Sequence, residues 1–282
     1  MKLVDLNYML KEADKNHYAV GAFNYCNAET AQAIIETGSR LRSPVMYIIG
    51  PWELDLLGPR MMAKIVRDLA EDSDVPVCLH LDHATDLETV KACIDAGFPS
   101  VMMDGSHCDT FEENVRITRA AVEMAKDKGI TVEGELGAVG RVDGLSPEGD
   151  NKMLLTDPGQ AVEFVERTGI DALAVSIGNG HGMYPQRPVL DFERLEAIRK
   201  ITGIPLVLHG GSGIPADQLH KAIDLGISKV NVATELAHAY LAALDNRESG
   251  MWYAKALIQA KSAVSKVVER WMLELGCAGR LK

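Results

Sequence analysis

The segment VPVCLHLDH at residues 75–83 is a short apolar run that ends in an aspartate and a histidine. Two later segments have the same form. ALAVSIGNGH at 172–181 ends in His181, and PLVLH at 205–209 ends in His209. Such runs are typical of buried strands, so three histidines are expected at the carboxyl ends of three strands.

Short apolar runs alternate with longer amphipathic stretches along the chain, with no domain boundary or internal repeat. Eight such units predict an α/β fold, a (β/α)8 TIM barrel, as a single domain over residues 1–282 with an extra C-terminal helix at 251–276. A doubly wound open sheet is the alternative, but it usually has fewer strands and a single switch-point site. The strands are predicted at 19–24, 44–50, 75–82, 100–106, 130–136, 171–178, 205–211 and 228–234, and the intervening helices near 28–41, 59–71, 86–96, 110–128, 158–168, 191–201, 215–225 and 234–245.

The composition excludes several classes of protein. A formal net charge of −11 argues against a nucleic-acid binder, although local backbone amides can still hold an anionic substrate. The N-terminal MKLVDLNYMLKEADK does not resemble a signal peptide, and no window has the length and hydropathy of a membrane span. Five scattered cysteines without CxxC spacing indicate reduced thiols, and hence a cytoplasmic protein.

The histidines His83, His181 and His209 suggest a divalent-metal site, because parallel barrels keep their chemistry at the carboxyl ends of the strands. Zinc is the default ion for three imidazoles, though cobalt, manganese or iron can use the same ligands. The alternative is that each histidine is a hydrogen-bonded structural residue. Asp82 either orients an imidazole or acts as a general acid/base, and we favour the second role.

Further candidates follow other predicted strands. Asp104 and Glu135 lie at the ends of two of them, where they could cap helices, form ion pairs or supply a second cation site. Alternation places Glu133 on the same face as Glu135, pointing inward. The segment HGGSG at 209–213 precedes a helix, and NVAT at 231–234 ends the last strand. Loops at these two places often bind phosphate, and tight turns are the alternative.

Together, LHLDHA, VMMDGS, VEGELG, SIGNGHGMY, LHGGSG and KVNVATEL resemble the class II, metal-dependent ketose-bisphosphate aldolases, especially the tagatose-/fructose-1,6-bisphosphate branch. The resemblance spans nearly the whole chain, from AFNYCN to LGCAGR. It implies a (β/α)8 barrel and reversible cleavage of a ketose 1,6-bisphosphate to dihydroxyacetone phosphate and an aldehyde, glyceraldehyde 3-phosphate. It also implies a homodimer or homotetramer that acts on a small sugar phosphate in carbohydrate metabolism such as glycolysis.

The resemblance also assigns roles to individual residues. It implies that His83, His181 and His209 bind zinc and that Asp82 is the acid/base for the C4 hydroxyl. Asp104 and Glu135 match a second metal position in the family. The residues that match the pocket for dihydroxyacetone phosphate are Gly182, Gly210, Gly211, Ser212, Asn231, Val232, Ala233 and Thr234.

Two segments depart from the family pattern. The long Gly- and Asp-rich loop at 137–157 reads as a lid, in which Asp143 stands where the family has a glutamate that moves a proton on the donor carbon. Arg141 replaces a small residue there. The family's C-terminal Asp-Pro-Arg, whose arginine binds the distal phosphate, is missing. Arg141 and Lys255 are the candidate replacements for that arginine.

These departures leave other functions open. An aldolase that uses a different aldehyde is the first alternative. A metal-dependent hydrolase is the second, but the predicted phosphate pocket argues against it. A non-catalytic subunit is the third, and the intact Asp82 and the three histidines argue against that.

Overall fold

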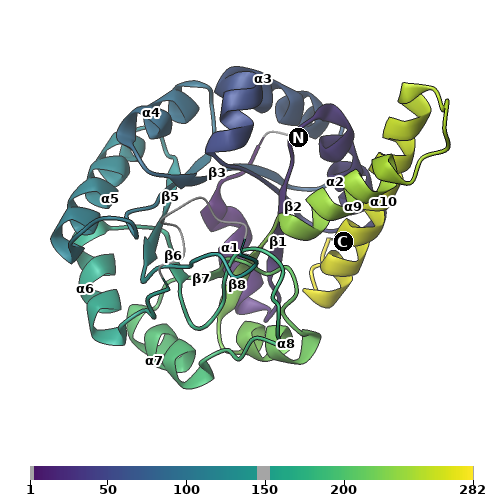
Figure 1. Cartoon of the computed structure of the whole chain (residues 1–282). Coiled ribbons are helices and arrows are strands. Elements are labelled where there is room, and N and C mark those ends of the chain that lie inside the picture. The colour runs from purple at the N-terminus through teal and green to yellow at the C-terminus, as the bar shows by residue number, and fades with distance from the viewer. Residues whose placement is uncertain (1–2, 145–152, 282) are drawn as a thin grey trace.

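The computed structural model describes residues 3–144 and 153–281. Their eight strands are all parallel and pair in chain order, with β8 returning to β1, so that they form a closed barrel (Figure 1). This topology confirms the predicted (β/α)8 barrel. The strands are β1 Val20–Asn24, β2 Val45–Ile49, β3 Val77–Ala84, β4 Ser100–Met103, β5 Thr131–Leu136, β6 Ala172–Val175, β7 Leu206–Leu208 and β8 Ile227–Val232.

A helix follows each strand, and one further helix lies at each end of the described chain. Several helices begin where the sequence offers a capping side chain: Asp86, Thr110 and Asp157 each accept a hydrogen bond from a first-turn amide. The helices are α1 Leu6–Lys15, α2 Ala28–Leu41, α3 Pro51–Glu71, α4 Leu87–Asp95, α5 Phe111–Lys126, α6 Pro158–Thr168, α7 Phe192–Thr202, α8 Ala216–Asp224, α9 Thr234–Asp245 and α10 Tyr253–Glu274.

Helix α3 begins earlier than the predicted start at residue 59. Pro51 occupies its first turn, and the Glu53 side chain accepts a hydrogen bond from the Gly50 amide at 2.9 Å. The helix is then broken at Gly58, whose φ of 72° and ψ of 156° are not helical. Pro59 follows the break, so the predicted start corresponds to the second of two helical segments.

Helix α1 lies across one end of the barrel (Figure 1). Its buried face consists of Leu6, Met9, Leu10 and Ala13, and it contacts β1, β3, β5 and β8. The Leu6 amide also donates to Thr131 Oγ1 at 3.1 Å, at the start of β5. The amino-terminal end of the barrel is thereby closed, which leaves the carboxyl end open for chemistry.

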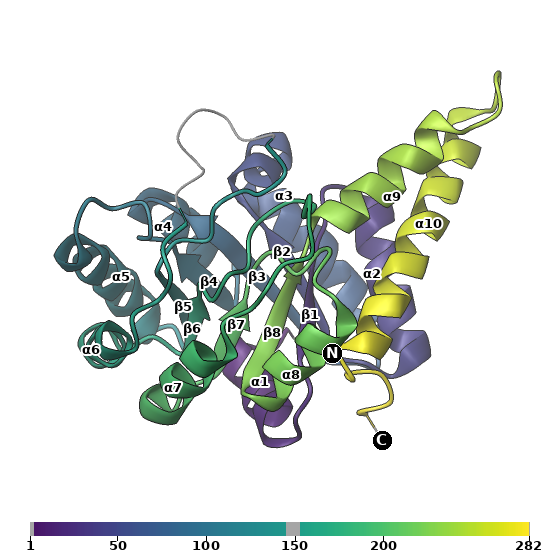
Figure 2. The same ribbon diagram turned by 60° about the horizontal axis from the view of Figure 1, so that its bottom comes forward.

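Helices α9 and α10 pack against each other and project beyond the barrel (Figure 2). Helix α10 is the extra C-terminal helix that the sequence predicts, and its base packs on α2. Trp271 is almost fully buried there, and its Nε1 donates to Glu235 Oε2 at 3.2 Å. Along the described chain, no helix combines the length and the apolar character that a membrane span requires.

We predict that Trp271→Ala lowers the free energy of unfolding by about 3–5 kcal/mol, because it removes a large buried side chain. The control is Leu273→Ala, since Leu273 lies on the same helix but is 57% exposed. It should change stability by no more than about 0.5 kcal/mol. Urea denaturation measures both values. Equal losses would mean that the base of α10 does not pack on the barrel in solution.

Candidate metal centre and active site

The structure brings the three predicted histidines together at the carboxyl ends of β3, β6 and β7. The ring centroids of His83 and His209 lie 4.5 Å apart, those of His83 and His181 5.0 Å, and those of His181 and His209 6.0 Å. One ring nitrogen from each histidine lies within 4.8 Å of the others. Three side chains from separate strands therefore face one point.

Carboxylates fix the orientation of two of these rings. His83 Nδ1 lies 2.7 Å from Asp104 Oδ2, and His209 Nε2 lies 2.9 Å from Glu133 Oε1. Each carboxylate accepts a hydrogen bond from the imidazole, so the lone pair of the neutral ring is on its other nitrogen.

The nitrogens that remain, His83 Nε2 and His209 Nδ1, are buried and have no hydrogen-bond partner among the described residues. Buried polar atoms are rarely left unpaired. Two lone pairs directed at one point beside a third imidazole are the donor set of a divalent cation. The residues present therefore fit a divalent metal.

The backbone at His83 is unusual for a strand. His83 has a φ of 50°, and the pairing of β3 with β4 shifts register between Leu81 and Ala84. In a regular strand, Asp82 and His83 would point to opposite faces. The bulge turns both toward the mouth of the barrel, where Asp82 Oδ2 lies 3.9 Å from His83 Nε2.

Asp82 is held as an ionised carboxylate beside the histidines. Asn231 Nδ2 donates to both of its oxygens, at 2.9 and 3.1 Å. Burial alone would raise the pKa of Asp82, but the positive charges of His83 and Lys229 outweigh burial and lower it below its ordinary value. A carboxylate in this state can accept a proton.

The pKa values of the histidines show where the site favours positive charge. Burial, with repulsion from His83, lowers the pKa of His181 to about 3, so His181 is neutral. Burial also acts to lower the pKa of His83, but Asp82 and Asp104 outweigh it and raise that pKa to about 10. The surrounding carboxylates thus favour positive charge at the position of His83.

The residues predicted for a second cation site also lie here. Glu135 Oε2 is 3.1 Å from His209 Nδ1 and 4.0 Å from His83 Nδ1, without the alignment of a hydrogen bond. His83, Asp104 and Glu135 can each offer an atom within 4.8 Å of the others. Asp104, however, already accepts from His83 and from the Ser106 amide, so it acts as an orienting group.

The loop after β5 is joined to the loop after β6. The His181 amide donates to Gly140 O and the Val142 amide to His181 O, both at 2.9 Å. This pairing sets Asp143 over Gly182, where an added Cβ would lie 2.1 Å from Asp143 Oδ2. Of the predicted lid at 137–157, residues 145–152 lie outside the described residues.

Arg141 lies at the site but is engaged by Asp143. Its Nη2 and Nε donate to the two Asp143 oxygens at 2.6 and 3.2 Å. The structure does not bring Lys255 into the histidine cluster, because this residue is exposed in the first turn of α10 on the projecting hairpin. Arg141 is thus the better placed of the two cations predicted for the acceptor.

The predicted phosphate loops are tightly packed against each other. Gly210 has a φ of 63°, and a Cβ there would lie 2.0 Å from Gly180 O. The Gly211 amide donates to Asn231 O at 3.0 Å, which joins the loops after β7 and β8. Helix α9 then begins at Thr234, and the Glu235 amide in its first turn donates to Ser212 Oγ at 3.3 Å. A glycine-rich turn beside a helix start suits an anion. The other residues predicted to line this pocket are Gly182, Ser212, Val232 and Ala233.

Sequence reasoning missed several residues that support the site. Asn179 Nδ2 donates to His209 O at 3.1 Å, and Tyr184 OH accepts from the Gly180 amide at 2.7 Å and donates to Gly210 O at 3.0 Å. It also missed Lys229, which pairs with Glu133 inside the barrel. A signal was available, because Lys229 stands two residues before Asn231 in an apolar strand and so shares its face.

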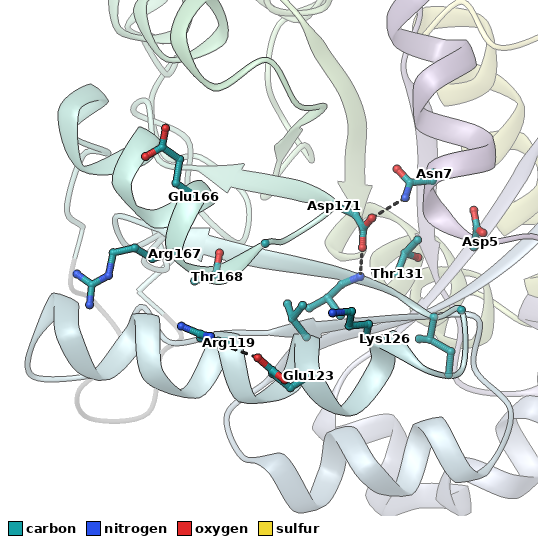
Figure 3. A pocket seen from close by; sticks show the side chains of 15 residues that line it. Asp5, Asn7, Arg119, Glu123, Lys126, Thr131, Glu166, Arg167, Thr168 and Asp171 are labelled. Carbon is teal, nitrogen blue, oxygen red and sulfur yellow. Dashed lines mark hydrogen bonds and ion pairs between the residues drawn. The ribbon is translucent and has the colours of Figure 1, made fainter.

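A hollow of about 660 Å³ lies away from the histidines, between α1, α5 and α6 (Figure 3). Asp171 accepts hydrogen bonds there from Asn7 Nδ2 at 2.5 Å and from the Val132 amide at 2.8 Å. These contacts tie α1 to the amino-terminal end of the barrel. Because that end of a TIM barrel serves stability, the hollow is not the candidate active site.

Comparison with known proteins agrees with this geometry. The family model "Fructose-bisphosphate aldolase class-II" matches residues 4–280. The chain belongs to this family. A fructose-bisphosphate aldolase from Geobacillus stearothermophilus is 43% identical over 288 residues, which cover 99% of both sequences. As a class II aldolase, the protein is a carbon–carbon lyase that cleaves a ketose bisphosphate, and the family implies a divalent metal.

Solved structures described as aldolases share the fold. The YdjI aldolase from Escherichia coli K12 superposes with a TM-score of 0.88 at 34% identity, covering 99% of this chain and 100% of that one. A protein from Coccidioides immitis described as a fructose-1,6-bisphosphate aldolase superposes with a TM-score of 0.91 at 33% identity, covering 98% and 97%.

Proposed function

We propose that the protein reversibly cleaves the C3–C4 bond of fructose or tagatose 1,6-bisphosphate to dihydroxyacetone phosphate and glyceraldehyde 3-phosphate. We propose that it does so with one zinc ion on His83, His181 and His209. The observation that carries this proposal is the pair of buried ring nitrogens, His83 Nε2 and His209 Nδ1, which face His181 and have no hydrogen-bond partner in the described part of the chain. A bound divalent ion supplies a Lewis acid that polarises the substrate carbonyl.

In this proposal Asp82 is the general base for cleavage. It takes the proton of the C4 hydroxyl and returns it in the reverse direction. Its hydrogen bonds from Asn231 and its position 3.9 Å from His83 Nε2 support this role. Asn231 was predicted to line the phosphate pocket, and its side-chain amide also orients the Asp82 carboxylate.

Asp143 is proposed to move the proton on the donor carbon. Two observations support this role. Asp143 lies over Gly182, next to His181, and Arg141 donates hydrogen bonds to both of its oxygens. Arg141 has five N–H donors, of which two point to Asp143. We propose that the others bind an anionic acceptor aldehyde.

The remaining pocket residues are proposed to hold the donor phosphate. Backbone amides at Gly210 and at the start of α9 would bind its oxygens, aided by the helix dipole. An anchored phosphate fixes the reacting carbons relative to Asp82 and Asp143. Tight glycine packing at Gly210 supports this assignment, since no other residue fits there.

We further propose one barrel domain over residues 1–282 that forms a homodimer or homotetramer in the cytoplasm. Helices α9 and α10 extend past the barrel and expose Leu241, Trp252, Tyr253 and Ile258, which supports contact with a second copy of the chain. The five cysteines all lie in the described part of the chain as free thiols, which supports a reducing compartment.

We predict that the purified protein binds one zinc ion per chain and that His181→Ala weakens binding more than about 100-fold. Loss of a ligand should exceed the roughly 10–100-fold cost of losing a group that only orients one. Competition with a chromophoric chelator measures the affinity. Chelator should abolish aldol cleavage, and added zinc should restore it. Full cleavage by metal-free protein would refute the proposed site.

Asp82→Ala should lower kcat for cleavage by about 10²–10⁴-fold, the range expected for a general acid/base. Zinc content should stay at the wild-type level, because Asp82 is not among the three ligands. Cleavage assays and metal analysis of the same samples give both values. A loss of zinc as large as in His83→Ala would show that Asp82 serves the metal and not the proton.

Asp143→Ala should suppress exchange of solvent deuterium into dihydroxyacetone phosphate and leave the zinc content unchanged. The reason is that exchange requires a base at the donor carbon. NMR spectra of the donor substrate follow the exchange. Asp82→Ala is the matched control and should retain exchange, since its base acts on the C4 hydroxyl. Normal exchange in Asp143→Ala would place the base elsewhere.

A further inference from the structure

A buried ion pair crosses the interior of the barrel below the histidines. Lys229 Nζ, on β8, lies 2.8 Å from Glu133 Oε2, on β5, and both side chains are fully buried. Strands β5 and β8 are not neighbours, so this contact spans the barrel. Buried charges carry a large desolvation cost, and a buried pair by itself is weak support for stability. The pair therefore calls for a specific role.

Glu133 uses its two oxygens for two different partners. Oε2 accepts from Lys229, and Oε1 lies 2.9 Å from His209 Nε2. Lys229, Glu133 and His209 thus form a continuous hydrogen-bonded chain that ends at the histidine cluster. His80 Nε2 lies 3.6 Å from Glu133 Oε2 but makes no hydrogen bond, so it does not replace the ammonium.

This chain decides which nitrogen of His209 faces the cluster. A carboxylate at Nε2 requires a hydrogen there, which leaves the lone pair on Nδ1. Nδ1 is the buried nitrogen without a hydrogen-bond partner that faces the other two rings. If Glu133 moved away, Nε2 would lose its acceptor and the ring would lose its fixed orientation.

We propose that Lys229 is a positioning residue of the metal centre: it anchors Glu133 Oε2, keeps Glu133 Oε1 on His209 Nε2, and so directs His209 Nδ1 to the metal. This inference rests on the proposed three-histidine site. Without the ammonium, the buried carboxylate loses its counter-charge and the hydrogen bond to Oε2. Groups that orient a metal ligand in this way contribute about 10–100-fold to metal affinity.

The test measures the zinc affinity of Lys229→Met by competition with a chelator. We expect binding about 10–100-fold weaker than in the wild type, with an altered visible spectrum of the cobalt-loaded protein. The double variant Lys229→Met/Glu133→Gln should recover most of the affinity. A glutamine carbonyl still accepts from His209 Nε2, its amide faces the unpaired His80 Nε2, and it needs no counter-charge.

Two controls separate this effect from other causes. Cys78→Ala removes a fully buried side chain of β3 that is not part of the hydrogen-bonded chain, so it should lower stability without changing zinc affinity. The second control, His181→Ala, tests whether the three histidines bind the metal at all. Wild-type affinity in His181→Ala would overturn the three-histidine site, whereas weak binding there with wild-type affinity in Lys229→Met would overturn only the role of Lys229.

Two further outcomes also decide the proposal. Equally weak binding by the single and double variants would show that the lysine does not act through Glu133. If Lys229→Met does not fold, nitrogen-15 NMR of the zinc-loaded wild type can show which ring nitrogen of His209 carries the hydrogen and which binds the metal. The proposal requires a hydrogen on His209 Nε2 and a metal on Nδ1, and the reverse arrangement would overturn it.

Discussion

The rest of the site depends on one constraint: imidazole nitrogens that face one another in a buried pocket need a cation between them. His83 and His209 have their outward nitrogens bound by Asp104 and Glu133, which leaves the inward nitrogens unpaired. Such an arrangement is costly without a positive charge at its centre. The acidic residues around the histidines, and the raised pKa of His83, follow from the same requirement.

Several features of the barrel bring the histidines and the carboxylates together. Parallel closure brings the carboxyl ends of β3, β6 and β7 to one opening, and α1 closes the other end. The bulge at His83 then turns two consecutive residues, Asp82 and His83, to the same place. The proposed ligand His83 and the proposed base Asp82 thus come from adjacent positions, which a regular strand does not allow. The two proposed roles are therefore linked through the backbone of β3.

Much of this could be predicted from the sequence, because it depends on local patterns. Short apolar runs predicted the strands, and the histidines after them predicted the candidate ligands. Contacts that depend on closure of the barrel could not be predicted. Lys229 and Glu133 are 96 residues apart and meet only across the interior. The bulge at His83 and the pairing of Arg141 with Asp143 also need three-dimensional detail, so the sequence suggested an anion-binding Arg141 and not its hold on Asp143.

Anomalous diffraction at the zinc edge, from crystals of the zinc-loaded protein, locates the metal. We predict one strong peak per chain, about 2.0–2.1 Å from His83 Nε2, from His209 Nδ1 and from a ring nitrogen of His181. Asp82 and Glu133 should lie outside the set of ligands. A peak away from the three histidines, or coordination through His209 Nε2, would contradict this prediction.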